Sequence, residues 1–118
     1  MIQTMLAVAL TLTLAVAPAL PVGSVHEAAQ VAVGTNGAAC PGGEAILVLR
    51  LALAEGPFTL FVARTRFILV DEREGDDTPV WFGTVGADAN ASLSGSYVRA
   101  FREVREASPC AWLAGTGA

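Results

Sequence analysis

The amino-acid sequence predicts an all-β domain behind an N-terminal export signal, and two observations lead to this prediction. Residues 44–70 contain two long apolar runs, rich in β-branched and aromatic side chains, on either side of the turn dipeptide Gly56-Pro57. An acidic loop over residues 71–79 and a short apolar run over residues 80–86 repeat the alternation of strand and turn. Because residues 44–70 hold most of the apolar side chains that can build a core, we expect a buried antiparallel pair of strands there.

Residues 1–24 are predicted to be a signal peptide, since this segment is apolar and ends in prolines and small residues. Cleavage after Ala19 or after Ser24 would satisfy the small-residue rule of the processing enzyme. An uncleaved anchor is the alternative, and only in that case would the chain contact a membrane. A helix over residues 2–17 would be about 24 Å long, short of the roughly 30 Å hydrocarbon core. We therefore expect a secreted or extracytoplasmic protein in which residues 25–118 form one domain.

Short-range signals locate the strands that follow. Residues 30–33 alternate in polarity and are expected to form an edge strand that the turn signal Asn36-Gly37 ends, and Pro41-Gly42-Gly43 marks the next turn. Residues 45–54 are predicted to be a strand, although Leu and Ala also favour a helix and Glu55-Gly56-Pro57 would end one. The strand is preferred because the run after it has strong β propensity and a hairpin accommodates both.

The second apolar run contains an irregularity. In residues 58–70 the side chains of Arg64 and Arg66 interrupt one face, which predicts a bulge or a change of sheet near residues 63–66. Together with Arg50, these arginines would share a sheet face if paired strands have equal parity, and they would then form an anion-binding patch. A solvated face is the preferred interpretation.

Residues 96–107 admit two interpretations. The spacing of apolar residues favours a helix capped by Ser96, with Arg99-Glu103 and Arg102-Glu106 as pairs four residues apart, and this gives an α+β alternative to the all-β class. We prefer a strand over residues 97–104. Each helical pair contributes only about 0.2 to 0.5 kcal/mol, whereas an added strand pairs exposed backbone groups of an apolar sheet.

In this strand the side chains of Tyr97, Arg99 and Phe101 would lie on one face, because successive side chains alternate across a sheet. They would form an aromatic-and-arginine surface suited to a ligand, and they are the predicted ligand-binding residues. A helix would instead turn Tyr97 and Phe101 into the core.

The two cysteines, Cys40 and Cys110, are predicted to form one disulfide, because an even cysteine count in an exported chain is typical of structural cross-links. The bond would tie the start of the central strands to the C-terminal region. Loop-closure entropy makes such a bond worth on the order of 4 kcal/mol. A metal or redox site is the weaker alternative, since there is no Cys-x-x-Cys and the one histidine is His26.

Residues 87–101, Ala-Asp-Ala-Asn-Ala-Ser-Leu-Ser-Gly-Ser-Tyr-Val-Arg-Ala-Phe, resemble the strand-turn-strand of bacterial secreted immunoglobulin-like modules, and more narrowly of the neocarzinostatin-like apoproteins. The match covers 15 of the 118 residues. The resemblance implies an immunoglobulin-like sandwich of about seven strands, with a small-molecule cleft in the neocarzinostatin-like members. The short-range disulfides of that family are absent and Ala91 stands where glycine is usual, so no binding residue of the family is carried over.

Three further segments have an expected structural role. The acidic residues 71–77 are expected to form a solvated loop, with calcium binding by their carboxylates as the alternative. Residues 88–92 are expected to form a turn rather than a calcium loop, because Leu93 stands where such a loop needs glycine. Trp81 and Trp112 are expected in the core or at its rim rather than in a ligand platform.

Composition limits the classes of function. The net charge is -4 and there is no basic tract, which argues against a nucleic-acid partner. The chain has no lysine, one tyrosine and one histidine, so the usual nucleophile-base pairs are absent. We predict an exported, non-catalytic binding or structural module without metal or cofactor, whose ligand is a small molecule or a protein. The alternative is a small secreted hydrolase that uses paired carboxylates from Glu44, Glu55 or residues 71–77.

Overall fold

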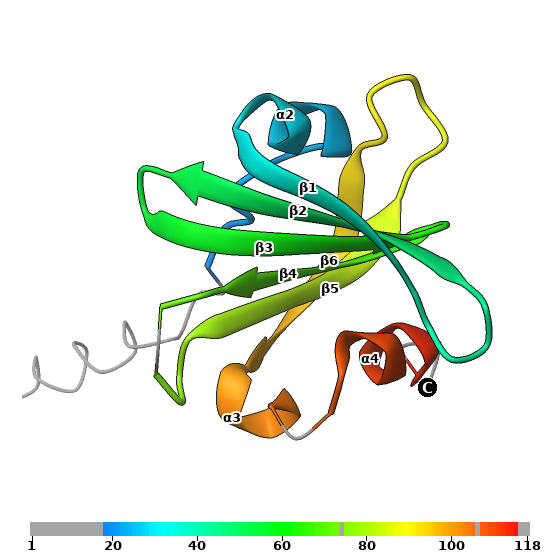
Figure 1. Cartoon of the computed structure of the whole chain (residues 1–118). Coiled ribbons are helices and arrows are strands. Elements are labelled where there is room, and N and C mark those ends of the chain that lie inside the picture. The colour runs from blue at the N-terminus through cyan, green and yellow to red at the C-terminus, as the bar shows by residue number, and fades with distance from the viewer. Residues whose placement is uncertain (1–17, 74, 106, 116–118) are drawn as a thin grey trace, which may run out of the picture.

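The computed structural model describes residues 18–73, 75–105 and 107–115, which form one antiparallel sheet with short helices against both of its faces (Figure 1). The predicted all-β class is confirmed. The six strands follow one another in the sheet in their order along the chain. They are β1 (Ala32–Ala39), β2 (Ala45–Leu53), β3 (Gly56–Ala63), β4 (Arg66–Asp71), β5 (Pro79–Val85) and β6 (Leu93–Ala100), and the helices are α2 (Val25–Gln30), α3 (Phe101–Val104) and α4 (Pro109–Gly115).

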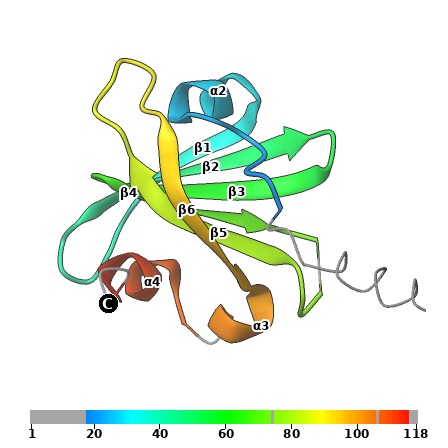
Figure 2. The ribbon, with the colours of Figure 1, turned by 180° about the vertical axis from the view of Figure 1, so that it is seen from behind.

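The sheet is strongly twisted, so that β5 and β6 cross the direction of β1, β2 and β3 (Figure 2). Helix α2 lies on one side of the sheet, and α3 and α4 lie on the other (Figures 1 and 2). An isolated bridge between Ser24 and Ser92 adds a short extended segment beside β6. Both faces are therefore covered, as in a sandwich, although the hydrogen-bonded strands belong to one open sheet.

Each face of the sheet carries its own apolar core, because the strands alternate apolar side chains to both sides. The first core lies under α2 and the segment before it, and the second core lies under α3 and α4. The buried residues of the first core are Val22, Ala28, Leu49, Leu51, Phe58, Leu60, Phe67, Leu69, Trp81 and Leu93. Those of the second core are Ile46, Ala63, Ile68, Val70, Val80, Phe82 and Leu113. Strands β3 and β4 contribute buried residues to both cores, whereas in β2 only Ile46, Leu49 and Leu51 are buried.

The predicted central hairpin is confirmed, but its turn lies earlier than the sequence indicated. Strand β2 pairs with β3 from Leu53 opposite Gly56 onward, so the connecting residues are Ala54 and Glu55. Gly56 is the first residue of β3 and has a φ of 133°, a backbone conformation that residues with a Cβ rarely adopt. Glycine is therefore needed at the start of the strand rather than inside the turn. Pro57 follows as the second residue of the strand, a position where its missing N–H is tolerated.

The irregularity predicted near residues 63–66 is a second hairpin, and the prediction of a bulge or a change of sheet was wrong. Ala63 pairs with Arg66, which leaves Arg64 and Thr65 as a two-residue connection. Arg64 has a φ of 54°, in the left-handed region that tight hairpins require. The sequence did not indicate this turn, because arginine and threonine are not typical turn residues.

The predictions for the first strand were wrong in two places. Residues 25–30 form α2, because the Ser24 side chain accepts a hydrogen bond from the Glu27 N–H and caps the helix. Asn36 and Gly37 lie inside β1, where they pair with Val48 and Leu47 of β2. They form no turn, because β1 continues along β2 as far as Ala39. The turn that joins these two strands lies over residues 40–44, as Pro41-Gly42-Gly43 indicated.

Residues 96–105 combine both interpretations of the sequence, and the predicted Arg102-Glu106 pair involves a residue outside the described part of the chain. Strand β6 continues to Ala100, and α3 begins at Phe101, so the predicted strand is correct over residues 97–100 and wrong beyond them. The strand gives way to the helix where the Phe101 and Arg102 N–H groups donate hydrogen bonds to the carbonyl groups of Thr78 and Asp76, at 2.8 and 3.0 Å. These bonds turn the chain away from the sheet, and Val104 packs in the second core from a helix.

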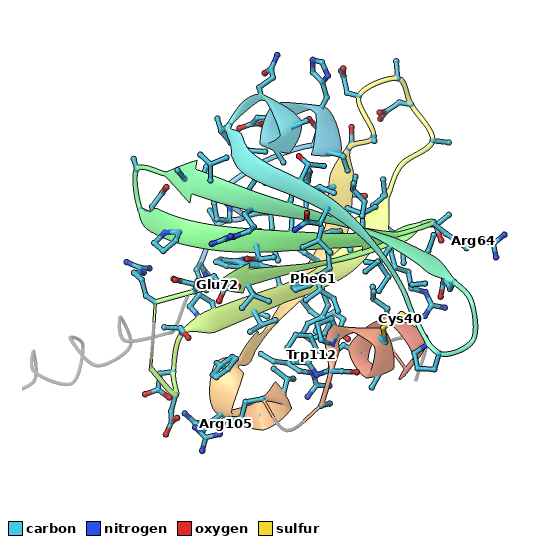
Figure 3. All side chains as sticks on the ribbon, in the orientation of Figure 1. Cys40, Phe61, Arg64, Glu72, Arg105 and Trp112 are labelled. Atoms are coloured by element: carbon cyan, nitrogen blue, oxygen red, sulfur yellow. A yellow bond between two sulfur atoms is a disulfide. The ribbon has the colours of Figure 1, made fainter. Side chains whose placement is uncertain are left out.

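The predicted disulfide is confirmed. Cys40 and Cys110 are bonded, with their Cα atoms 5.6 Å apart, and the bond links the β1–β2 connection to α4. Phe61 and Trp112 belong to the same side of the sheet as Cys40 (Figure 3). The predicted membrane-anchor segment, residues 2–17, lies outside the described residues. Within the described part of the chain, no helix has the length and apolarity needed to cross a membrane.

Candidate binding surface on strand β6

Tyr97 stands on the edge strand β6 with its ring stacked on a core aromatic side chain. Phe82 of β5 is its cross-strand partner, and the two ring centroids lie 5.2 Å apart with an interplanar angle of 13°. Phe82 is only 3% exposed, whereas Tyr97 is 43% exposed. The core therefore holds the Tyr97 ring in place while part of it remains open to solvent.

Arg99 lies on the same face, two residues further along β6. Its guanidinium carbon is 5.6 Å from the centroid of the Tyr97 ring, and its Nη1 is 3.6 Å from Oε1 of Glu103 in α3. The Arg99 and Glu103 side chains are 50% and 46% exposed. A cation–π contact or an ion pair at such exposure contributes about 1 kcal/mol or less, so a ligand can recruit the guanidinium at little cost.

Phe101, the third predicted ligand-binding residue, does not extend this surface. It is half-buried, packs against the second core and starts α3. The candidate binding surface therefore consists of Tyr97 and Arg99 above Phe82, and we call it the Tyr97–Arg99 surface.

Phe101 instead forms part of a hollow beside the acidic loop. This hollow, of about 410 Å³, is lined by Asp71, Glu72, Arg73, Gly75, Asp76, Phe101 and Arg105. Two of its lining residues, Glu72 and Arg105, are labelled in Figure 3. Its charged groups include arginines as well as carboxylates, so the local charge is mixed rather than uniformly acidic.

Asp71 is buried at the end of β4 and is held by Arg73. Its Oδ1 accepts hydrogen bonds from the Arg73 backbone N–H at 3.0 Å and from Nε at 2.9 Å. Burial raises the pKa of Asp71, but the hydrogen bonds and positive charge of Arg73 outweigh burial and hold the pKa below its usual value. The carboxylate is therefore kept ionised and engaged, which does not suit a general acid.

Arginines of the C-terminal helix region also hold the acidic loop. Asp77 forms an ion pair with Arg102, and Asp76 forms one with Arg105. In the described residues there is no group of three or more side chains that would suit a metal ion. The Asp76 and Asp77 side chains stay exposed, as expected of a solvated loop, while their ion pairs connect the loop to α3 and the residue after it.

The turn over residues 88–92 closes on its own first side chain. The Asp88 carboxylate accepts bonds from the Asn90 N–H at 3.0 Å and from the Ser92 hydroxyl at 2.7 Å. Hydrogen bonds from the Ser92 hydroxyl and from nearby N–H groups lower the pKa of Asp88. Ala91 has a φ of 54°. These groups have a structural role in the turn.

The three arginines of the central strands do not form one patch. Arg50 pairs with Thr59 and Arg66 with Ala63, so the two lie on one face but roughly 13 Å apart along the strands at 3.3 Å per residue. Arg66 donates a hydrogen bond to the Leu113 carbonyl at 2.5 Å. Arg64 lies in the turn, at the opposite end of the sheet from Glu72 (Figure 3).

Trp81 lies in the first core and Trp112 at the rim of the second, as expected. Trp81 is 3% exposed in the first core, and its indole N–H donates to the Pro18 carbonyl at 3.2 Å. Trp112 packs edge-on against Phe82 in the second core, and its indole N–H donates to the Val104 carbonyl at 2.9 Å. Trp112 thus attaches the C-terminal region to the aromatic side chain that supports Tyr97.

Two of the carboxylates considered for a hydrolase, Glu44 and Glu55, are far apart. Glu44 and Glu55 flank the nine-residue strand β2, which at about 3.3 Å per residue separates them by roughly 30 Å. The paired carboxylates of glycoside hydrolases stand about 5 to 9.5 Å apart. These two residues therefore do not form such a pair.

Comparisons with protein-family models, with curated proteins and with solved structures found no match to this chain.

Proposed function

We propose that this protein is an exported, non-catalytic binding module whose ligand contacts the Tyr97–Arg99 surface. The observation that carries the proposal is the exposed tyrosine ring on the buried Phe82, with the Arg99 guanidinium beside it. A ring supplies flat apolar area and a guanidinium supplies planar donors for an anion. The ligand, a small molecule or a segment of another protein, would present a flat apolar group next to an anionic group.

Export is supported by the disulfide between Cys40 and Cys110. Such bonds form and persist in oxidising environments outside the cytoplasm. The apolar N-terminal segment has the composition of a signal peptide. The two features point to the same compartment independently of each other.

A non-catalytic role is supported by the state of the carboxylates. Asp71 and Asp88 both have lowered pKa values and fixed hydrogen-bond partners, and Glu44 and Glu55 are at opposite ends of β2. A hydrolase of the paired-carboxylate type needs one carboxyl group with a raised pKa near a second, ionised one.

Titration of the oxidised protein with 1-naphthoate, followed by amide chemical shifts, tests the binding surface. We expect a dissociation constant on the order of 1 mM, typical of a small probe with one ring and one charge, and the largest shifts at Tyr97, Val98 and Arg99. The uncharged 1-naphthylmethanol should bind several-fold more weakly because it lacks the group that Arg99 recognises.

Four variants test whether the binding depends on the proposed residues. Tyr97→Ala and Arg99→Gln should each weaken naphthoate binding several-fold, and Glu103→Gln should strengthen it, because Glu103 competes for the same guanidinium. Arg64→Gln, which removes an exposed arginine at a turn far along the sheet, is the matched control and should bind as the wild type does.

Unchanged chemical shifts at Tyr97–Arg99, or an equal loss of naphthoate affinity in the Arg64 variant, would refute the proposed binding surface. Turnover of a panel of chromogenic glycosides would refute the non-catalytic role.

A further inference from the structure

Residues 20–24, which the sequence assigned to the signal peptide, are part of the packed fold. Val22 is 2% exposed and belongs to the first core, and Leu20 packs against that core. The chain therefore enters the sheet structure several residues before the predicted domain start at residue 25.

Gly23 and Ser24 make backbone and capping contacts that also depend on this segment. The Leu93 N–H donates to the Gly23 carbonyl at 2.9 Å, at the start of β6. Ser24 Oγ accepts from the Glu27 N–H at 2.9 Å, and the Glu27 carboxylate accepts from the Gly23 N–H at 3.0 Å. This reciprocal arrangement stabilises the N-terminus of α2.

Pro18 and Ala19 differ from the residues that follow, since both are exposed. This dipeptide is joined to the rest of the fold by the 3.2 Å hydrogen bond from the Trp81 indole N–H to the Pro18 carbonyl. Removal of these two residues would cost one hydrogen bond at the edge of the first core. Removal of residues up to 24 would also empty the Val22 site, unpair Leu93 and uncap α2.

We propose that the export-processing peptidase cuts the bond between Ala19 and Leu20, so that the mature protein begins with Leu20. Water adds across this peptide bond, which leaves a carboxylate on Ala19 and a free amino group on Leu20. Ala19 at the cut and Ala17 two residues before it are the small residues that such an enzyme accepts. Cleavage after Ser24 satisfies the same rule, but the packing of Val22 and the cap by Ser24 oppose it.

This inference rests on the proposed export, and the N-terminal sequence of the exported protein tests it. The full chain is produced in secreting bacterial cells, and the exported fraction is analysed by intact mass and N-terminal sequencing. We expect a chain that starts Leu20-Pro21-Val22 and carries the disulfide. An exported, disulfide-bonded chain that starts at Val25 or Pro18, or that keeps Met1, would overturn the cleavage site and leave export standing. A chain retained in the cytoplasm would overturn both proposals.

Two substitutions separate the candidate sites. Ala19→Phe places a bulky side chain at the cut without touching a buried position, and it should reduce processing at least ten-fold. Ser24→Asp blocks cleavage after residue 24, because a charged residue is not accepted there, while aspartate still caps a helix. This variant should be processed at the wild-type rate to the Leu20 terminus. Normal processing of Ala19→Phe, or failure of Ser24→Asp, would contradict the assignment.

Discussion

Removal of the disulfide tests how the C-terminal region is held on the sheet. In the variant Cys40→Ser/Cys110→Ser, the unfolded chain regains the freedom of a loop that spans 70 residues, which corresponds to about 4 kcal/mol in the chain-entropy model. Native-state strain and residual structure in the unfolded chain reduce this figure in practice, so we expect a loss of about 2 to 4 kcal/mol. For a small domain with a free energy of unfolding of about 5 to 15 kcal/mol, this loss is large.

Helix α4 should loosen before the sheet unfolds. Without the bond, it is held by the buried Leu113 side chain, by the hydrogen bond from Arg66 to the Leu113 carbonyl and by the Trp112 contacts with Phe82 and Val104. Trp112 lies in this attached region, whereas Trp81 lies in the opposite core.

Urea unfolding of the oxidised, reduced and serine-substituted proteins measures both effects. Tryptophan fluorescence and far-UV circular dichroism should give the same midpoint for the oxidised protein. In the variant, the fluorescence transition should begin at lower urea, because Trp112 is released first. Equal midpoints for the oxidised protein and the variant would refute the role assigned to the bond.

Three further substitutions have directions fixed by the structure. Gly83→Ala would place a methyl carbon 2.6 Å from a ring carbon of Phe67 and should cost about 1 to 3 kcal/mol in the free energy of unfolding, measured in urea. Ala91→Gly should stabilise the protein by up to about 1 kcal/mol in the same assay, because glycine adopts the φ of 54° without strain. Asp71→Asn should cost about 1 to 3 kcal/mol at pH 7 by breaking the bonds to Arg73. Because the folded-state pKa of Asp71 is lowered, its contribution is complete above the ordinary value of about 4 and is lost as the pH falls through the lowered value, so the difference between wild type and Asp71→Asn should vanish in strong acid.

Each of these substitutions has a matched control. Gly37→Ala adds a methyl group with nothing within 4 Å and should not destabilise the protein as Gly83→Ala does. Ala89→Gly, in the same exposed turn as Ala91, should not stabilise, and Glu72→Gln should change stability by less than about 0.5 kcal/mol. Equal effects in a substitution and its control would contradict the reason given for it.

The sequence predicted the strands that hydrophobicity alone determines. Residues 45–54 and 58–70 are mostly apolar, and they supply strands β2, β3 and β4, which carry most of the buried residues of both cores. Turn positions were less predictable. Gly56 lies at a strand start, and the turn at Arg64 and Thr65 carries no glycine or asparagine signal. Helix α2 was missed although Ser24 and Glu27 form a recognisable capping pair, because residues 1–24 had been assigned to the signal peptide.

The candidate surface was predictable in part. The alternation of Tyr97 and Arg99 placed both on one face, as found. Phe101 does not extend the exposed surface, because it starts α3 and packs against the second core, where its N–H bonds to the Thr78 carbonyl across 23 residues of chain. No local pattern indicates that contact. The ion pair of Asp77 with Arg102 likewise joins residues 25 positions apart, so the sequence indicated the exposed acidic loop but not its partner.

Backbone chemical shifts and ring contacts over residues 93–107 test the central claim most directly, because the candidate surface exists only if β6 is a strand up to Ala100. We expect extended shifts from Leu93 to Ala100, helical shifts at Phe101–Val104, and nuclear Overhauser effects between the rings of Tyr97 and Phe82. Continuous helical shifts from Ser96 to Ala107, without the ring contacts, would contradict both the fold of β6 and the Tyr97–Arg99 surface.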